Sequence, residues 1–257
     1  MRFRLQRDER DNEVPTFKLT IEYDGTAYAG WQRQPDQLTL QALVEDAIRT
    51  VTQTEVPAVG AGRTDAGVHA LGQVVSFKSE KSLSAREWMR ALNGLLPGDI
   101  GVRSAEQVAD DFHARYSARE KLYEYRILNR KERSALDRNR AWHVPNRLDV
   151  DVMRAGAKLL VGRHDFSSFQ GSSTDTQNPM CALQRLEIIE DQPLIRIEAQ
   201  ADRFLKQMVR AIVGTMVEVG QGKRPPQSMK DILEAKDRRA AGVTAPPHGL
   251  YLVRVIY

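Results

Sequence analysis

The sequence predicts an α+β protein built from two tandem ferredoxin-like β-α-β-β-α-β halves with largely antiparallel sheets. Short segments alternate apolar and polar residues as half-buried strands do, amphipathic helical segments lie between them, and this order of elements occurs twice. Of the 257 residues, 41% are hydrophobic, which suffices for a core. We expect residues 1–15 to be a loose extension, 16–110 to form the N-terminal half and 111–257 the C-terminal half.

Each element of the N-terminal half has its own sequence pattern. The expected elements are a strand at 17–23, a helix after Thr39, strands near 56–60 and 72–78, a helix at 84–95 and a strand near 100–108. Apolar residues at every second position of the first segment give the period-two pattern of a strand. Thr39 is a preferred residue for a helix N-terminus, and Pro97-Gly98 ends the second helix.

The C-terminal half repeats this order. Its expected elements are a strand at 121–128, a helix at 149–161, strands at 183–190 and 194–201, a helix at 203–219 and a last strand at 250–257, with an extra helix near 227–236. The helix at 203–219 has a buried apolar stripe and one basic side, formed by Arg203, Lys206 and Arg210. Sheets of this type carry helices on one face, and RNA-recognition modules stack bases on the other.

The distribution of charge favours a polyanionic partner such as RNA. The net charge is only +4, but between Arg115 and Arg140 there are nine Lys and Arg residues and only four Asp and Glu residues. Tyr116, Tyr123 and Tyr125 lie in the same stretch, and interleaved basic and aromatic residues suit nucleic-acid binding. The alternative is a solvated surface whose charges are partly paired.

Cysteine, histidine and hydropathy patterns exclude several classes of protein. The one cysteine, Cys181, rules out an intramolecular disulfide and a cysteine-based metal cluster, and the five histidines show no metal-ligand spacing, so we expect no metal site. No stretch approaches 18 consecutive apolar residues, and the charged first 15 residues lack the apolar core of a signal peptide. We therefore expect a soluble, cytoplasmic protein with no membrane partner.

The segment Gly62-Arg63-Thr64-Asp65-Ala66-Gly67-Val68-His69 is the most informative part of the chain. An arginine two residues from an aspartate favours an ionised carboxylate, which can act as a nucleophile, and the glycines allow close backbone approach. The segment lacks the G-K-[ST] ending of a P-loop and the G-x-G-x-x-G spacing of a dinucleotide fold. A surface ion pair in a turn is the alternative interpretation.

This segment resembles the signature loop of the tRNA pseudouridine synthase A family, and further motifs follow in that family's order. They are Glu22-Tyr23-Asp24-Gly25, Gly30-Trp31-Gln32-Arg33-Gln34, Asn93-Gly94-Leu95-Leu96-Pro97-Gly98-Asp99-Ile100, Asp111-Phe112-His113-Ala114-Arg115, Met208-Val209-Arg210 with Ile212-Val213-Gly214, and Gly249-Leu250-Tyr251-Leu252. The resemblance extends from about residue 17 to the last residue, and ordered motifs are more specific than one Gly-rich loop.

The resemblance implies an enzyme that isomerises uridine to pseudouridine in the tRNA anticodon stem-loop, at positions 38, 39 and 40, without a cofactor. Such an enzyme cuts the bond from the sugar C1′ to N1 of uracil, turns the base and rejoins it through C5. The resemblance assigns Asp65 as the catalytic nucleophile, which attacks either C1′ or C6 of the ring. A third route removes the 2′ proton to give a glycal and also needs one aspartate. A stacked base must first be flipped out.

Further positions match family residues that contact the substrate. Arg63 is expected to occupy the space left by the flipped base and to hold a phosphate, and Arg210 to pair with Asp65. Tyr123 is expected to stack on the target base. Tyr125 shares its strand face and is interpreted as packing.

Three other positions have weaker assignments. Leu252 matches an apolar position that lines the uracil pocket, and a plain core leucine is the alternative. Arg203 and Lys206 are candidates for contact with RNA phosphates, and the alternative is that both side chains are simply solvated.

The resemblance also implies how the tRNA is held. The two halves are expected to meet around a central RNA-binding cleft, and two subunits to form a homodimer that shares one tRNA. The basic run from Arg130 to Arg140 is a candidate for remote contact. Two other classes stay open. A non-catalytic tandem RNA-binding module would not need Asp65, and an RNA or nucleoside glycosidase would normally add a second carboxylate as acid.

Overall fold

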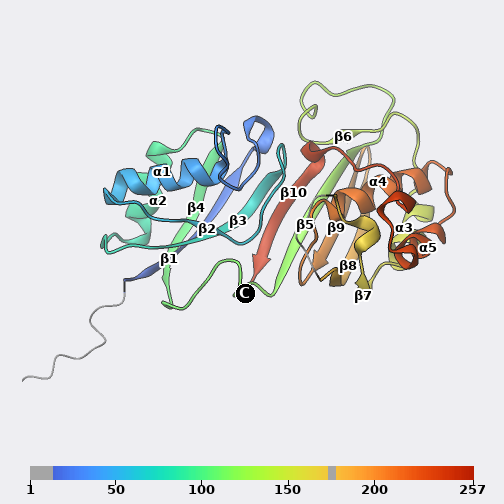
Figure 1. The fold of residues 1–257 in the computed structure, drawn as a ribbon. Coiled ribbons are helices and arrows are strands. Elements are labelled where there is room, and N and C mark those ends of the chain that lie inside the picture. Colours follow the sequence, from blue (N-terminus) through green and yellow to red (C-terminus); the bar gives the residue numbers. More distant parts are fainter. Residues whose placement is uncertain (1–13, 173–177) are drawn as a thin grey trace, which may run out of the picture.

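The computed structural model describes residues 14–172 and 178–257 and contains one large sheet with helices packed on it (Figure 1). Residues 1–13 of the expected extension lie outside the described residues. The strands are β1 (Thr16–Tyr23), β2 (Val59–Gly60), β3 (His69–Lys78), β4 (Ile100–Val108), β5 (Glu120–Leu128), β6 (Trp142–His143), β7 (Gly162–Asp165), β8 (Met180–Asp191), β9 (Leu194–Ala201) and β10 (Leu250–Ile256). The α-helices are α1 (Leu40–Thr52), α2 (Ala85–Leu95), α3 (Val150–Lys158), α4 (Met208–Gly220) and α5 (Ser228–Ala235).

The sheet is continuous and mostly antiparallel. Its strand order is β4-β1-β3-β10-β5-β9-β8-β7, with β2 paired to β3 and β6 paired to β5. Only β3–β10 and β5–β6 are parallel pairs in the described chain. The β3–β10 pair joins the halves, with Tyr251 opposite His69 and Leu252 opposite Ala70. The α+β class and the largely antiparallel pairing are therefore confirmed, and the halves share a single sheet.

The helices of both halves pack on the same face of the sheet (Figure 1). In the N-terminal half, Trp88 of α2 is fully buried against Phe17 and Phe77. Across the junction, Ala70, Leu252 and Tyr123 follow one another in register on β3, β10 and β5, and all are buried. The apolar face of the sheet is therefore continuous across the junction of the two halves.

The opposite face of the C-terminal half carries charged side chains. Glu124 of β5 forms ion pairs with Arg126 on the same strand and with Arg196 on β9. Arg185 on β8 pairs with Glu198 on β9. Because side chains alternate along a strand, these polar positions fall between the apolar ones that the helices cover.

The sequence predicts that helix α4 begins at residue 203, but α4 begins at Met208. The preceding residue, Gln207, has φ 60° and ψ 6°, in the left-handed region, so the right-handed helix cannot continue back through it. Arg203 and Lys206 therefore lie in the turn between β9 and α4. The prediction that they form one basic helix side with Arg210 is wrong.

Several strand boundaries also differ from the predicted ones. Strand β3 starts at His69 instead of 72, so the last residue of the Gly-rich motif is already part of the sheet. Strands β6 and β7 were not predicted. β7 reads Gly-Arg-His-Asp and has no apolar residue to mark a period of two, and it pairs antiparallel with β8 at the end of the sheet.

Candidate active site

Most of the Gly62–His69 segment forms the loop between β2 and β3, with His69 as the first residue of β3, and the loop is held from two sides. Gly30 has φ 95°, and a Cβ atom there would lie 2.6 Å from the carbonyl oxygen of Thr64, so only glycine allows this approach. The Trp31 N–H donates to the same carbonyl at 3.0 Å. On the other side, Gly67, with φ 77°, lies against Pro247.

Arg210 of α4 holds the carboxylate of Asp65. Its Nη1 donates to Oδ2 of Asp65 at 2.8 Å, and its Nε donates to the carbonyl oxygen of Ala245 at 2.8 Å. The Arg210 side chain is only 12% exposed, whereas that of Asp65 is 30% exposed. Within residues 14–172 and 178–257, no other side chain bonds to this carboxylate, so Oδ1 stays open. The pairing of Arg210 with Asp65 that the resemblance implies is present.

Arg63 lies on the same loop but does not pair with Asp65. Its side chain is exposed, and its Nε donates to Oε1 of Gln32 at 2.9 Å. The interpretation of a local Arg63–Asp65 ion pair is therefore wrong. The cation beside Asp65 comes from the other half of the chain, and the guanidinium of Arg63 is tethered at the surface.

Tyr123 and Tyr125 point to the same face of β5 but have different surroundings. The Tyr123 hydroxyl lies 3.9 Å from where a Cβ on Gly62 would be, and its ring packs edge-on against Phe204 at 5.0 Å. Burial raises the pKa of Tyr123, and the nearby Tyr23 and Asp65 raise it further. Tyr125 is fully buried and donates to the carbonyl oxygen of Pro246 at 2.8 Å. Tyr123 therefore lies beside the loop, and Tyr125 supports the segment behind it.

Leu252 lies on β10 between the strands that carry the loop and Tyr123. It is opposite Tyr123 on β5 and opposite Ala70 on β3, and it is fully buried. Its position beside Tyr123 fits an apolar wall and fits a plain core leucine equally well.

Polar side chains beneath the loop complete the site and were not predicted. The hydroxyls of Tyr23 and Thr64 hydrogen-bond at 2.8 Å, and Nε2 of Gln73 donates to the carbonyl oxygen of Gly62 at 2.7 Å. Tyr23 and Thr64 belong to motifs that the chain shares with the family, so the sequence could have indicated them as site residues. Gln73 and Phe204 lie outside these motifs, and only the fold brings them to the loop.

His69, the last residue of the motif, fixes a different segment. Its Nδ1 accepts from the N–H of Gly25 at 3.0 Å, so its proton is on Nε2, which donates to the carbonyl oxygen of Asn139 at 2.9 Å. The ring stacks on Tyr251, whose hydroxyl donates to the carbonyl oxygen of Arg140 at 2.8 Å. The end of the basic run from Arg130 to Arg140 is thus held beside the last residue of the motif, and the contact of this run with tRNA stays a prediction.

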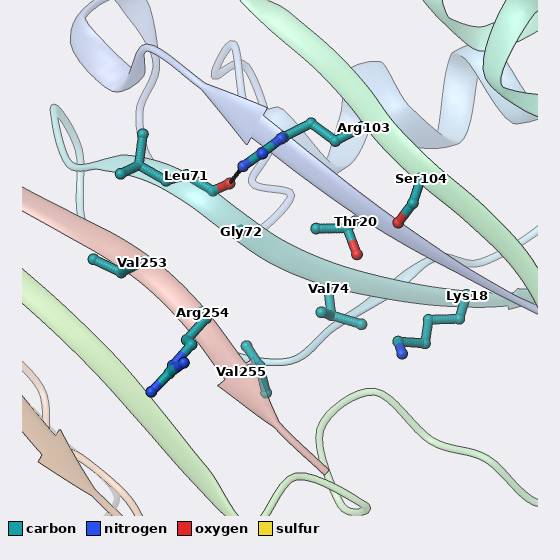
Figure 2. Close-up of a pocket in the computed structure, with 10 residues that line it drawn as sticks. All are labelled: Lys18, Thr20, Leu71, Gly72, Val74, Arg103, Ser104, Val253, Arg254 and Val255. Atoms are coloured by element: carbon teal, nitrogen blue, oxygen red, sulfur yellow. Dashed lines mark hydrogen bonds between the residues drawn. The ribbon is translucent and has the colours of Figure 1, made fainter.

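A groove of about 410 Å³ lies elsewhere on the sheet (Figure 2). Lys18, Thr20, Arg103 and Arg254 line it, from β1, β4 and β10, together with Gly72 of β3. Lys18, Thr20 and Val74 alternate with the buried Leu19 and Val75, so the groove is on the face opposite the helices. It contains no residue of the motif loop.

The residues that the structure describes contain no group of three or more His, Cys, Asp or Glu side chains that could hold a metal ion. None of their helices is long and apolar enough to cross a membrane.

The chemistry that this arrangement permits centres on one carboxylate. Asp65 is oriented through one oxygen and open at the other, and a tyrosine ring and a buried leucine lie nearby. A carboxylate held in this way can attack an electrophilic carbon or remove a proton.

Comparison with known proteins identifies the family. A family model described as tRNA pseudouridine synthase matches residues 19–117 and 157–257. The chain is 46% identical over 239 residues to a tRNA pseudouridine synthase A of Thermoanaerobacter sp. (strain X514), covering 93% of this chain and 98% of that one. It is 45% identical over 240 residues to tRNA pseudouridine synthase A 2 of Clostridium perfringens (strain 13 / Type A), with the same coverage.

Among solved structures, a crystal structure of the archaeal box H/ACA sRNP Nop10-Cbf5 complex gives a TM-score of 0.34 at 15% identity, over 84% of this chain and 47% of that one. That likeness is too weak to support any conclusion. The family model and the full-length relatives are sufficient: this chain belongs to the tRNA pseudouridine synthase A family and is an isomerase that forms pseudouridine in tRNA.

Proposed function

We propose that the enzyme acts on positions 38, 39 and 40 of the anticodon stem-loop, with Asp65 as the catalytic nucleophile after the target base is flipped out. The proposal for Asp65 rests on one observation. Oδ2 of its carboxylate is anchored by Arg210 at 2.8 Å, and Oδ1 is open. The substrate positions follow from the motifs that the chain shares with its family.

Uridine and pseudouridine are isomers, so the reaction consumes no co-reactant. The bond from C1′ to N1 breaks, a bond from C1′ to C5 forms, the C5 proton leaves and N1 takes up a proton. Asp65 supplies an electron pair to C1′ or C6 and is released when the new carbon–carbon bond is complete. Removal of the 2′ proton by the same carboxylate is the third route.

The neighbouring residues have complementary proposed roles. The exposed guanidinium of Arg63 takes the place of the flipped base and holds a phosphate, for which a planar, always charged group is suited. Tyr123 stacks on the target uracil and Leu252 lines its pocket. Two observations support these roles: the Tyr123 hydroxyl lies 3.9 Å from where a Cβ on Gly62 would be, and Leu252 is opposite Tyr123 in the sheet.

We further propose that each half is a ferredoxin-like unit and that the halves form an RNA-binding cleft between them. The N-terminal strands lie in the order β4-β1-β3-β2 and the C-terminal strands in the order β10-β5-β9-β8. Numbered by their place in the chain within each half, with the short β6 and β7 left out, both orders are fourth, first, third, second. The Arg210–Asp65 pair, which links the two halves, supports a shared site at their junction. Two such subunits are proposed to form a homodimer that binds one tRNA.

Product analysis tests the proposed reaction and its positions. The enzyme is incubated with tRNA labelled with tritium at C5 of uridine, and released tritium and free uracil are both measured. We expect tritium release without uracil, and expect it to disappear when uridines 38, 39 and 40 are all replaced by cytidine. Free uracil would indicate a glycosidase, and tritium release that survives the triple replacement would contradict the proposed positions.

A further inference from the structure

We infer that Lys121 binds a backbone phosphate of the RNA strand that carries the target uridine. The inference rests on the proposed function, because it assumes that RNA enters beside Asp65. It adds a contact at the edge of the motif loop that neither the motif nor its resemblance assigns.

Lys121 lies where the loop meets strand β5. Its Cε and Cδ atoms are 3.3 and 3.7 Å from where a Cβ on Gly62 would be, and the Tyr123 hydroxyl is 3.9 Å from the same point. Lys121 and Tyr123 are two residues apart on one strand, so their side chains share a face. The ammonium group is therefore placed next to the proposed position of the target base.

The charge of Lys121 is poorly compensated within the protein. Its side chain is half-buried, and it takes part in none of the ion pairs found in the part of the chain that the structure describes. Burial lowers the pKa of Lys121, and the neighbouring Arg115 and Arg203 lower it further, while Asp202 opposes them. An Asp202 oxygen already accepts from the N–H groups of Ala182 and Arg203. Three cations therefore share one nearby carboxylate, and an incoming anion would relieve the cost of the charge that stays uncompensated.

The surroundings indicate that the anion belongs to a single-stranded nucleic acid. Arg115 lies over the ring of Tyr116 at 5.7 Å, and that ring stacks on His113 at 4.3 Å. Tyr116 is 76% exposed, so most of its side chain is accessible to solvent. A cluster of cations beside an exposed aromatic ring is the arrangement by which proteins hold an unpaired strand, with phosphates on the cations and bases on the rings. A flipped nucleotide is unpaired in this sense.

The first test compares Lys121→Met with Lys158→Met. Lys158 is exposed in the last turn of α3, so its variant removes the same charge away from the loop. Binding of whole tRNA is measured over a series of salt concentrations. We expect Lys121→Met to weaken binding roughly 10-fold, as for loss of one charged hydrogen bond, and to reduce the slope of log K against log salt by about 0.7, one phosphate contact on a single strand. Lys158→Met and Lys121→Arg should keep the wild-type slope.

The second test locates the phosphate. Anticodon stem-loops are synthesised with a neutral methylphosphonate at each linkage flanking the target uridine. Wild-type enzyme should lose affinity at one linkage, and Lys121→Met should be insensitive to that same replacement. Equal salt slopes, or the same methylphosphonate profile for both proteins, would overturn the inference. These measurements need no turnover, so a wild-type enzyme that binds in this way but forms no pseudouridine would contradict the proposed function and leave the Lys121 contact standing.

Discussion

At the scale of single residues, the site depends on contacts between side chains that are far apart in the sequence. Asp65 could be identified from its motif, and its pairing with Arg210, 145 residues away, from the family resemblance. Elementary charge reasoning alone favoured Arg63 as the partner, which is wrong. Gln73 and Phe204 could not be found, because they reach the loop only through the packing of β3 and of the turn before α4.

Replacing Arg210 should impair the reaction whatever the state of the target base. Arg210→Met removes the hydrogen bond that orients Asp65 and leaves the Ala245 carbonyl without its donor. We expect the catalytic rate to fall by roughly 100-fold, and equally for stem-loops with a paired and an unpaired target uridine. Single-turnover rates on both substrates measure this, and a variant with a near wild-type rate on either would contradict the role of the pair.

Arg63→Ala should have a different pattern. If Arg63 replaces the flipped base in the stack, the variant loses most on a paired target, where flipping is costly, and less on an unpaired one. The same two substrates report this in parallel with Arg210→Met. Matching losses on both substrates for the two variants would show that the proposed division of roles is incorrect.

At the scale of elements, the spacing of apolar residues in the sequence predicted the long strands and helices. Where these elements begin and end depends on the local backbone conformation in the structure. The apolar stripe of α4 is visible in the sequence, but its start is set by the left-handed backbone of Gln207, which no pattern indicates. Ser84 was visible as a helix start, and the structure gives it a reciprocal capping box with Glu87. The two-residue β6 and the polar β7 are too short or too polar to show a period.

His69 should make stability depend on pH in a definite direction. Burial lowers the pKa of folded His69, although Asp24 opposes this, so the unfolded chain binds the proton first. The contribution of neutral His69 to the free energy of unfolding is complete above the pKa of an unfolded histidine, about 6.5. It is lost as the pH falls below that value.

The measurement is the free energy of unfolding in urea at several pH values from 7.5 to 5. His69→Gln should show a smaller loss over that range than wild type. His248, whose pKa burial also lowers, is replaced by Gln in a parallel variant to separate its share. A pH dependence unchanged by His69→Gln would contradict the docking of the Arg130–Arg140 run through a neutral imidazole.

At the scale of the whole molecule, repeated element order predicted two similar halves, but not how their sheets are joined. A parallel contact between β3 and β10 depends on residues 69–70 and 251–252, and nothing in either segment marks the other as its partner. The apolar side chains of Leu252 and Tyr123 are typical of any buried strand. The resemblance implies that the halves meet, but the β3–β10 pairing that joins them becomes visible only in the structure.

Light scattering of the free enzyme tests the proposed homodimer. A compact 257-residue chain has a radius of gyration of roughly 18 Å, so one subunit is shorter than a tRNA, and a second subunit would allow contact with both the elbow and the anticodon arm. We expect a mass about twice 29.1 kDa, and tRNA binding that weakens steeply with salt. A purely monomeric enzyme with full activity on whole tRNA would rule this assembly out.

The role of Asp65 is tested most directly by Asp65→Asn, which keeps the shape of the side chain and removes its charge. The rate of pseudouridine formation is measured in a single turnover at saturating tRNA, with tRNA affinity measured by filter binding on the same preparation. We expect a rate below about one thousandth of wild type, as for loss of a covalent nucleophile, and an affinity within a few-fold of wild type. A residual rate above that level, with binding intact, would show that another group performs the chemistry.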